Sequence, residues 1–98
     1  MDEFGGYLMQ QGLLDITLEY CAAWNYTPRA VSLTEEILGE REIEAFIRSW
    51  HMIPSTGGKF EVSVNGELVF SKKGEGRHAE PGEVRTAIVK KLEEVRPT

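Results

Sequence analysis

The chain has 98 residues, of which 41% are hydrophobic and 28% charged, as is typical of one small globular domain. Its formal net charge of -5 argues against a nucleic-acid-binding surface, because phosphate recognition needs a concentrated basic face. A single cysteine excludes an intrachain disulfide and fits a reducing compartment. No apolar run approaches the roughly 20 residues of a membrane span. We therefore expect a cytoplasmic soluble protein that binds neither nucleic acid nor membrane.

The beginning of the chain is rich in Gly and Gln, which predicts a flexible N-terminal segment over residues 1–12 and one domain over residues 13–96. Hydrophobic alternation then predicts a strand from Leu13 to Tyr20, because successive strand side chains point to opposite faces. One face is strongly apolar, so we expect it to face the core. Its residues are Leu14, Ile16, Leu18 and Tyr20.

A helix is predicted to follow this strand. Thr27 and Pro28 form a good start signal, with a hydroxyl suited to the N-cap and a ring that is pre-set for the first turn. Apolar residues then recur at helical spacing from Ala30 to Leu38. Gly39 is suited to end the helix.

The middle of the chain predicts three further strands. The first runs from Ile43 to Ile53 and is closed by Pro54. The other two, Lys59 to Val64 and Glu67 to Lys72, flank Asn65-Gly66. This dipeptide is the strongest short hairpin signal, because both central positions of a type I′ turn need positive φ.

After a Gly-rich loop, Pro81 opens a last helix that Arg96-Pro97 ends. The predicted order is therefore β-α-β-β-β-α. A strand, a crossover helix and a second strand form a right-handed parallel unit, to which the hairpin adds two antiparallel strands. We expect an α/β fold in which the helices pack on a mixed four-stranded sheet, as a two-layer sandwich.

These segments are similar to one known family. A strand ending in EYC, a helix, the block GGKFEVSVNGELVFSKKGEGR and a closing helix together resemble the Rdx family, which includes selenoproteins W, T and H. The resemblance covers the chain from Leu13 to Val95 and is most specific between Gly57 and Gly76. It implies a shortened thioredoxin-like fold with a Cys-x-x-Cys or Cys-x-x-selenocysteine loop at the head of the first helix. It also implies thiol redox chemistry or redox-linked binding, with glutathione or a redox protein as partner.

By position in this resemblance, Cys21 corresponds to the first cysteine of the motif, and Trp24 occupies the place of the second. A further departure is His78-Ala79, where many members have Phe-Pro. In a two-cysteine motif the second thiol resolves the mixed disulfide that the first has formed, so this chain cannot complete that cycle alone. A one-cysteine cycle remains, in which external glutathione resolves the mixed disulfide. The alternative is that Cys21 is a buried small hydrophobe, as free cysteines commonly are.

The reactivity of Cys21 depends on where the first helix begins. The resemblance places the start directly after Cys21, where the field of the helix N-terminus favours a thiolate, and we favour this interpretation. Pro28 would then lie inside the first turns and kink the helix. The Thr27-Pro28 signal instead predicts a later start, which leaves Cys21 in a loop.

The two histidines offer little further chemistry. His51 lies in the second predicted strand and His78 in the last loop. A thiolate–imidazolium pair would need one of them beside Cys21, and a lone loop histidine is more often solvated. One cysteine and two scattered histidines lack the spacing of metal ligands, so we expect no metal site and infer no cofactor.

Two functions remain open from the sequence. The first is a single-thiol redox protein, linked to glutathione through Cys21, for which we expect weak or no catalysis. The second is a redox-inactive interaction module that binds a partner through the Cys21–Trp24 loop and the neighbouring loop residues Thr56, Gly57 and Gly58. Tryptophan is enriched in binding hot spots, although the simpler interpretation, which we favour, is that the Trp24 indole caps the core beside the loop.

Overall fold

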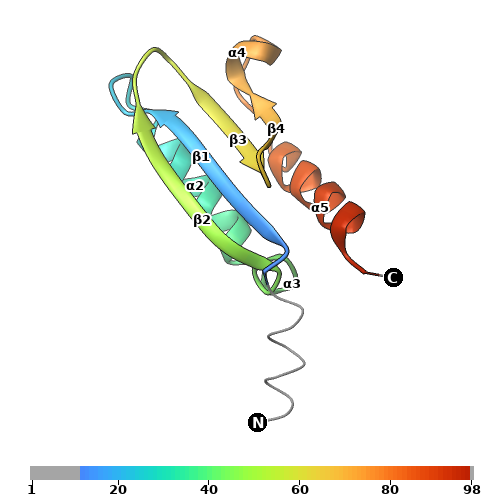
Figure 1. Ribbon diagram of the computed structural model, residues 1–98. Helices are drawn as coiled ribbons and strands as arrows, with labels where there is room; N and C mark the ends of the chain where they lie inside the picture. The colour runs from blue at the N-terminus through green and yellow to red at the C-terminus, as the bar shows by residue number, and fades with distance from the viewer. Residues whose placement is uncertain (1–11, 98) are drawn as a thin grey trace.

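The computed structural model of the protein describes residues 12–97, so the flexible segment expected over residues 1–12 falls, except for Gly12, outside the described residues. Figure 1 shows the elements in chain order. They are β1 (Leu14–Cys21), α2 (Thr27–Leu38), α3 (Arg41–Glu44), β2 (Ile47–Ser55), β3 (Phe60–Val64), β4 (Glu67–Ser71), α4 (Lys72–Glu75) and α5 (Glu83–Val95). None of the helices in this part of the chain is long and apolar enough to cross a membrane.

The four strands form one mixed sheet in the order β2-β1-β3-β4. β1 pairs in parallel with β2 and antiparallel with β3, and β3 pairs antiparallel with β4. The crossover helix α2 lies behind β1 and β2, and α5 lies beside β4 (Figure 1). The predicted α/β sandwich with a mixed four-stranded sheet is confirmed.

The core lies between the sheet and its helices. Every second residue of β1 is buried, as the alternation predicted, and these side chains join apolar residues of β3, β4, α2 and α5 in one cluster. Burial of this cluster is the main source of stability, because the hydrophobic effect scales with the apolar area removed from water. The fully buried members include Leu14, Ile16, Leu18, Ala30, Ile37, Val62, Val64 and Ile88.

The predicted Asn65-Gly66 turn is confirmed, with φ of 52° at Asn65 and 83° at Gly66. Asn65 also connects the hairpin to the beginning of β1. Its side-chain Oδ1 accepts a hydrogen bond from the Asp15 N–H at 2.8 Å, and its Nδ2 donates to the Leu13 carbonyl at 3.0 Å. The Asn65 N–H donates to the Asp15 carbonyl at 2.8 Å.

The predicted strand from Ile43 to Ile53 is wrong in its first part. Ile43 belongs to the short helix α3, whose turn places its side chain in the core at 2% exposure. β2 begins only at Ile47 and continues through Pro54 to Ser55. Because β2 is an edge strand, a proline without an N–H is tolerated there.

The last part of the chain also differs from the prediction. The Gly-rich loop contains α4, which begins where Ser71 Oγ accepts a hydrogen bond from the Gly74 N–H and ends at Gly76 with φ of 74°. α5 begins at Glu83 rather than at Pro81, because Gly82 at the N-cap has φ of 80°, which is outside the helical region.

Candidate functional site

The loop after β1 separates Cys21 from the first helix. Asn25 has φ of 61°, and the Tyr26 N–H donates to the Cys21 carbonyl at 3.0 Å, which closes residues 21–26 into a tight turn. α2 begins at Thr27, with Tyr26 at the N-cap and Pro28 in the first turn, where a proline causes no loss of a hydrogen bond. The expectation that the helix begins directly after Cys21 is therefore wrong, and the Thr27-Pro28 signal marked the right place.

Cys21 is fully buried at the end of β1, with 0% of its surface exposed. Its backbone N–H donates to the Lys59 carbonyl at 2.7 Å. Its Sγ accepts a hydrogen bond from the Trp24 N–H at 3.3 Å, as a serine or aspartate oxygen does when it caps a turn. The N–H, the carbonyl and the sulfur of Cys21 therefore each form a hydrogen bond that stabilises the loop.

Trp24 has the opposite environment, because 61% of its surface is exposed. Its ring lies against Gly58: a Cβ added at Gly58 would come within 2.6 Å of Trp24 Cζ3. Thr56 and Gly57 are exposed in the same turn. The structure thus places Trp24 in contact with the predicted loop of Thr56, Gly57 and Gly58, but Gly58 is buried beneath the ring and is not itself exposed. We call Trp24, Thr56 and Gly57 the Trp24 surface.

The rings of Trp24, Tyr26 and His78 contact one another in that order beside the start of α2, and we call these three residues the aromatic row. The rings of Trp24 and Tyr26 meet edge to face at a centroid distance of 6.2 Å. Those of Tyr26 and His78 meet in the same way at 4.9 Å. Lys72 Nζ lies 5.8 Å from the Tyr26 centroid, within cation–π range.

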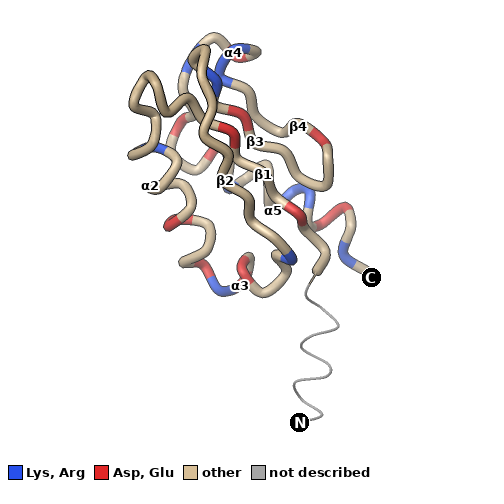
Figure 2. The backbone as a smooth tube through the Cα atoms, turned by 60° about the vertical axis from the view of Figure 1, so that its left-hand side comes forward, with Lys and Arg blue, Asp and Glu red and all other residues tan. Residues whose placement is uncertain are grey.

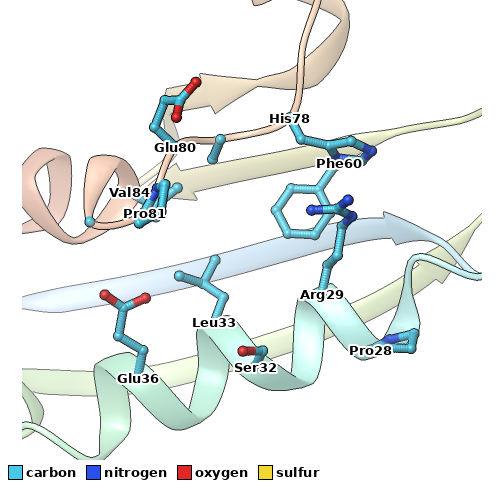
Figure 3. A pocket seen from close by; sticks show the side chains of 12 residues that line it. Pro28, Arg29, Ser32, Leu33, Glu36, Phe60, His78, Glu80, Pro81 and Val84 are labelled. Atoms are coloured by element: carbon cyan, nitrogen blue, oxygen red, sulfur yellow. The ribbon is translucent and has the colours of Figure 1, made fainter.

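The aromatic row ends at a cleft of about 560 Å³. One wall is α2, the other is the segment from His78 to Val84, and Phe60 of β3 lies between them (Figure 3). Cys21 does not line the cleft. Sequence reasoning missed this site, because the two walls are about 50 residues apart in the chain and no motif connects them.

The histidines are not placed to activate the thiol. His51 is exposed on β2, and His78 packs against Tyr26, whereas the hydrogen bond of the Cys21 sulfur comes from Trp24. Burial, followed by the positive charges of Arg29 and Lys72, lowers the pKa of His78 below its ordinary value. This lowering favours the neutral form of the imidazole.

The basic residues around α4 are visible as blue segments at that end of the molecule (Figure 2). Arg77 is not available to a ligand, since its guanidinium donates to both carboxylate oxygens of Glu83 at 2.7 and 2.9 Å. This pairing, together with the hydrogen bond that Glu83 accepts from the Glu80 N–H, lowers the pKa of Glu83 to about 2. Within residues 12–97, no group of three His, Cys, Asp or Glu side chains is arranged to hold a metal ion.

The fold and the loop between β1 and α2 define a thioredoxin-like α/β protein, in which the first strand leads through a tight turn into the crossover helix. The model of the Rdx family matches residues 15–90, which is more than half of the chain. The chain therefore belongs to the Rdx family.

Solved structures support this assignment. A selenoprotein W-related protein from Vibrio cholerae is 26% identical, with a TM-score of 0.73 over 81% of this chain and 96% of that one. A protein from Bordetella parapertussis shares the fold at 20% identity, with a TM-score of 0.72 over 81% of this chain and 98% of that one. No curated protein matches the sequence.

Proposed function

We propose that this member of the Rdx family is a protein-interaction module that binds a partner through the Trp24 surface and carries out no dithiol redox cycle. One observation carries the proposal: of the two positions of the Cys-x-x-Cys spacing, the one that holds the thiol is 0% exposed and the one that holds an indole is 61% exposed. The family loop therefore offers a partner a large aromatic side chain rather than a sulfur.

The setting of Trp24 suits it to this role. The ring rests on Gly58, where the missing side chain leaves room for it, and it meets Tyr26 edge to face. A side chain that is already ordered loses little entropy on binding, so more of its contact energy appears as affinity. Thr56 and Gly57 add exposed polar groups beside the ring, as in the hydrogen-bonding rim of an interface.

The experiment is capture of partners by the tagged full-length chain from its own cells, quantified by mass spectrometry. We expect Trp24→Ala to capture at least about tenfold less partner than the unchanged protein, since aromatic hot spots contribute about 2 kcal/mol or more to the binding free energy. Trp24→Phe should retain part of the binding. Leu68→Ala is the matched control, because Leu68 is also exposed, at 52%, but lies on β4.

Cys21→Ser should leave the capture unchanged, because serine keeps an oxygen that can accept the Trp24 N–H. A partner that is retained by Trp24→Ala but lost by Cys21→Ser would overturn the proposal and favour thiol chemistry.

The second candidate is the single-thiol redox function, and the position of the sulfur favours it: Cys21 Sγ contacts the exposed loop between β1 and α2 through the Trp24 N–H, 3.3 Å away. In the first step Cys21 loses its proton to solvent and attacks the glutathione sulfur of a mixed disulfide between glutathione and a partner protein. A Cys21–glutathione disulfide forms and the partner protein's thiolate leaves. A second glutathione thiolate then attacks this mixed disulfide, which restores Cys21 and releases glutathione disulfide. Because Cys21 is buried, the turn over residues 21–26 must open first.

This candidate is tested by the intact mass of the protein after incubation with glutathione disulfide. An adduct on the native protein that is absent from Cys21→Ser supports the single-thiol function. An adduct that forms only in denaturant rules it out and leaves the interaction module.

A further inference from the structure

The cleft between α2 and the segment from His78 to Val84 is large enough for a small ligand, since binding pockets commonly enclose about 300–1,000 Å³. Its middle is apolar: Phe60 and Val84, which belong to the core cluster, form its floor, and Leu33 and Ala79, which are only partly buried against that cluster, line its walls. Figure 3 shows Leu33 on α2 pointing toward the space between the two walls. A ligand in the cleft therefore meets apolar surface along its centre.

The two ends of the cleft carry opposite charges. Arg29 of α2 extends toward Phe60 and His78 at one end, and Glu36 of α2 and Glu80 of the facing segment lie at the other (Figure 3). Arg29 and Glu36 are seven residues apart, which places them on the same face of the helix, separated by about 10 Å along its axis. The cleft is therefore a bipolar site with a fixed spacing.

These charges are open to a ligand. In the part of the chain that the structure describes, Arg29, Glu36 and Glu80 form no ion pair with another side chain. The two arginines whose charges act on Glu36 and Glu80 are already paired with other carboxylates. These pairs are Arg85 with Glu40, beside Glu36, and Arg77 with Glu83, beside Glu80.

We propose that this cleft binds a linear zwitterion, with a carboxylate and an ammonium group about 10 Å apart and an apolar middle, such as an extended tripeptide with free termini. Three extended residues span about 10 Å, which matches the spacing along α2. The carboxylate lies at Arg29, the ammonium group at Glu36 and Glu80, and the apolar body on Leu33 and Ala79. No residue of the Trp24 surface takes part, so this proposal and the proposed function can fail separately.

The test is isothermal titration calorimetry of the full-length protein with trileucine in four forms: both termini free, N-acetylated, C-amidated, and blocked at both ends. We expect the free peptide to bind best, and each block to weaken binding about three- to fivefold, the range of a partly exposed ion pair. No saturable binding of the free peptide, or equal binding of all four forms, would overturn the proposal.

Two variants assign the ends. Arg29→Gln should weaken the free and acetylated peptides but not the amidated one, because the amide has no carboxylate for Arg29 to bind. Glu36→Gln should weaken the free and amidated peptides but not the acetylated one. Glu35→Gln is the matched control, since Glu35 is exposed on the same helix but does not line the cleft. If either variant weakens the binding of all four peptides equally, the assignment of the two ends is contradicted.

An NMR titration of His78 gives an independent readout. The charged groups acting on its imidazole are Arg29 and Lys72, which lower its pKa, and its ring contact is with Tyr26. A carboxylate bound at Arg29 offsets that positive charge, so trileucine should raise the pKa of His78 and its amide should not. An unchanged His78 pKa with saturating free peptide would place the carboxylate elsewhere and overturn the orientation.

Discussion

Cys21 and Trp24 are three residues apart, at the two positions that a Cys-x-x-Cys motif would occupy, yet they have opposite environments. Cys21 ends a central strand, is fully buried and accepts a hydrogen bond through its sulfur. Trp24 is mostly exposed and rests on the glycine of another loop. The comparison shows that a sequence motif fixes the spacing of two side chains but not which of them faces solvent. Here the tight turn at Asn25 sets that choice.

The largest expected effect comes from placing the same charge at both positions. Cys21→Asp should lower the free energy of unfolding by at least about 3 kcal/mol, because it buries a carboxylate without a charged partner. Trp24→Asp should cost less than about 1.5 kcal/mol, since its side chain reaches water. Urea denaturation measures both. Equal losses would contradict the difference in burial between the two positions.

An intermediate effect is expected at Gly58, on which Trp24 rests. Gly58→Ala should cost about 2 kcal/mol, because its φ of 77° strains a side chain and its Cβ would meet the Trp24 ring. Gly76→Ala is the control: it has a similar φ of 74° but no atom within 4 Å, so it should cost about 1 kcal/mol. When Trp24 is also replaced by Ala, the loss in the free energy of unfolding caused by Gly58→Ala should fall to the loss caused by Gly76→Ala. If it does not, the indole does not lie on Gly58.

The smallest effect concerns His78, at the far end of the aromatic row from Trp24. Its pKa should lie below the ordinary value of 6.5, and Tyr26→Ala should raise it by exposing the imidazole. As the pH falls, His78 is then protonated at a higher pH in the unfolded chain than in the folded chain. The stability that His78 contributes is therefore present above pH 6.5 and is lost as the pH falls through the lower folded pKa. NMR gives the pKa values, and His78→Gln should remove this part of the pH dependence. A His78 pKa at or above 6.5 would show that the row is not packed as described.

The sheet could be predicted because its signals are local. The alternation in β1 and the Asn65-Gly66 turn each depend on a few adjacent residues, and both were correct. The start of α2 is instructive, because the local signal of Thr27-Pro28 was right where the position implied by the family resemblance was wrong. Proline restricts the backbone directly, whereas the resemblance located the motif without regard to Asn25.

The sites that depend on tertiary contacts could be predicted only in part. The sequence suggested that Trp24 and Gly58 belong to one surface, but not that the ring fills the space above the glycine. The cleft was missed, because Arg29 and His78 come together only when α2 and the segment before α5 pack on the same face of the sheet. Ile43 was assigned to a strand because a buried residue in a short helix leaves no periodic pattern.

The side chain of Asn65 has a consequence for which residues this turn can accept. Its carboxamide adds one more pair of hydrogen bonds between β1 and the hairpin, because its oxygen accepts from the Asp15 N–H and its nitrogen donates to the Leu13 carbonyl. Glycine would adopt the positive φ but could not form this pair of hydrogen bonds, and aspartate would place a second acceptor against the Leu13 carbonyl. A carboxamide on a short stem meets all three demands, so a residue that resembles an ordinary turn former is in effect part of the sheet.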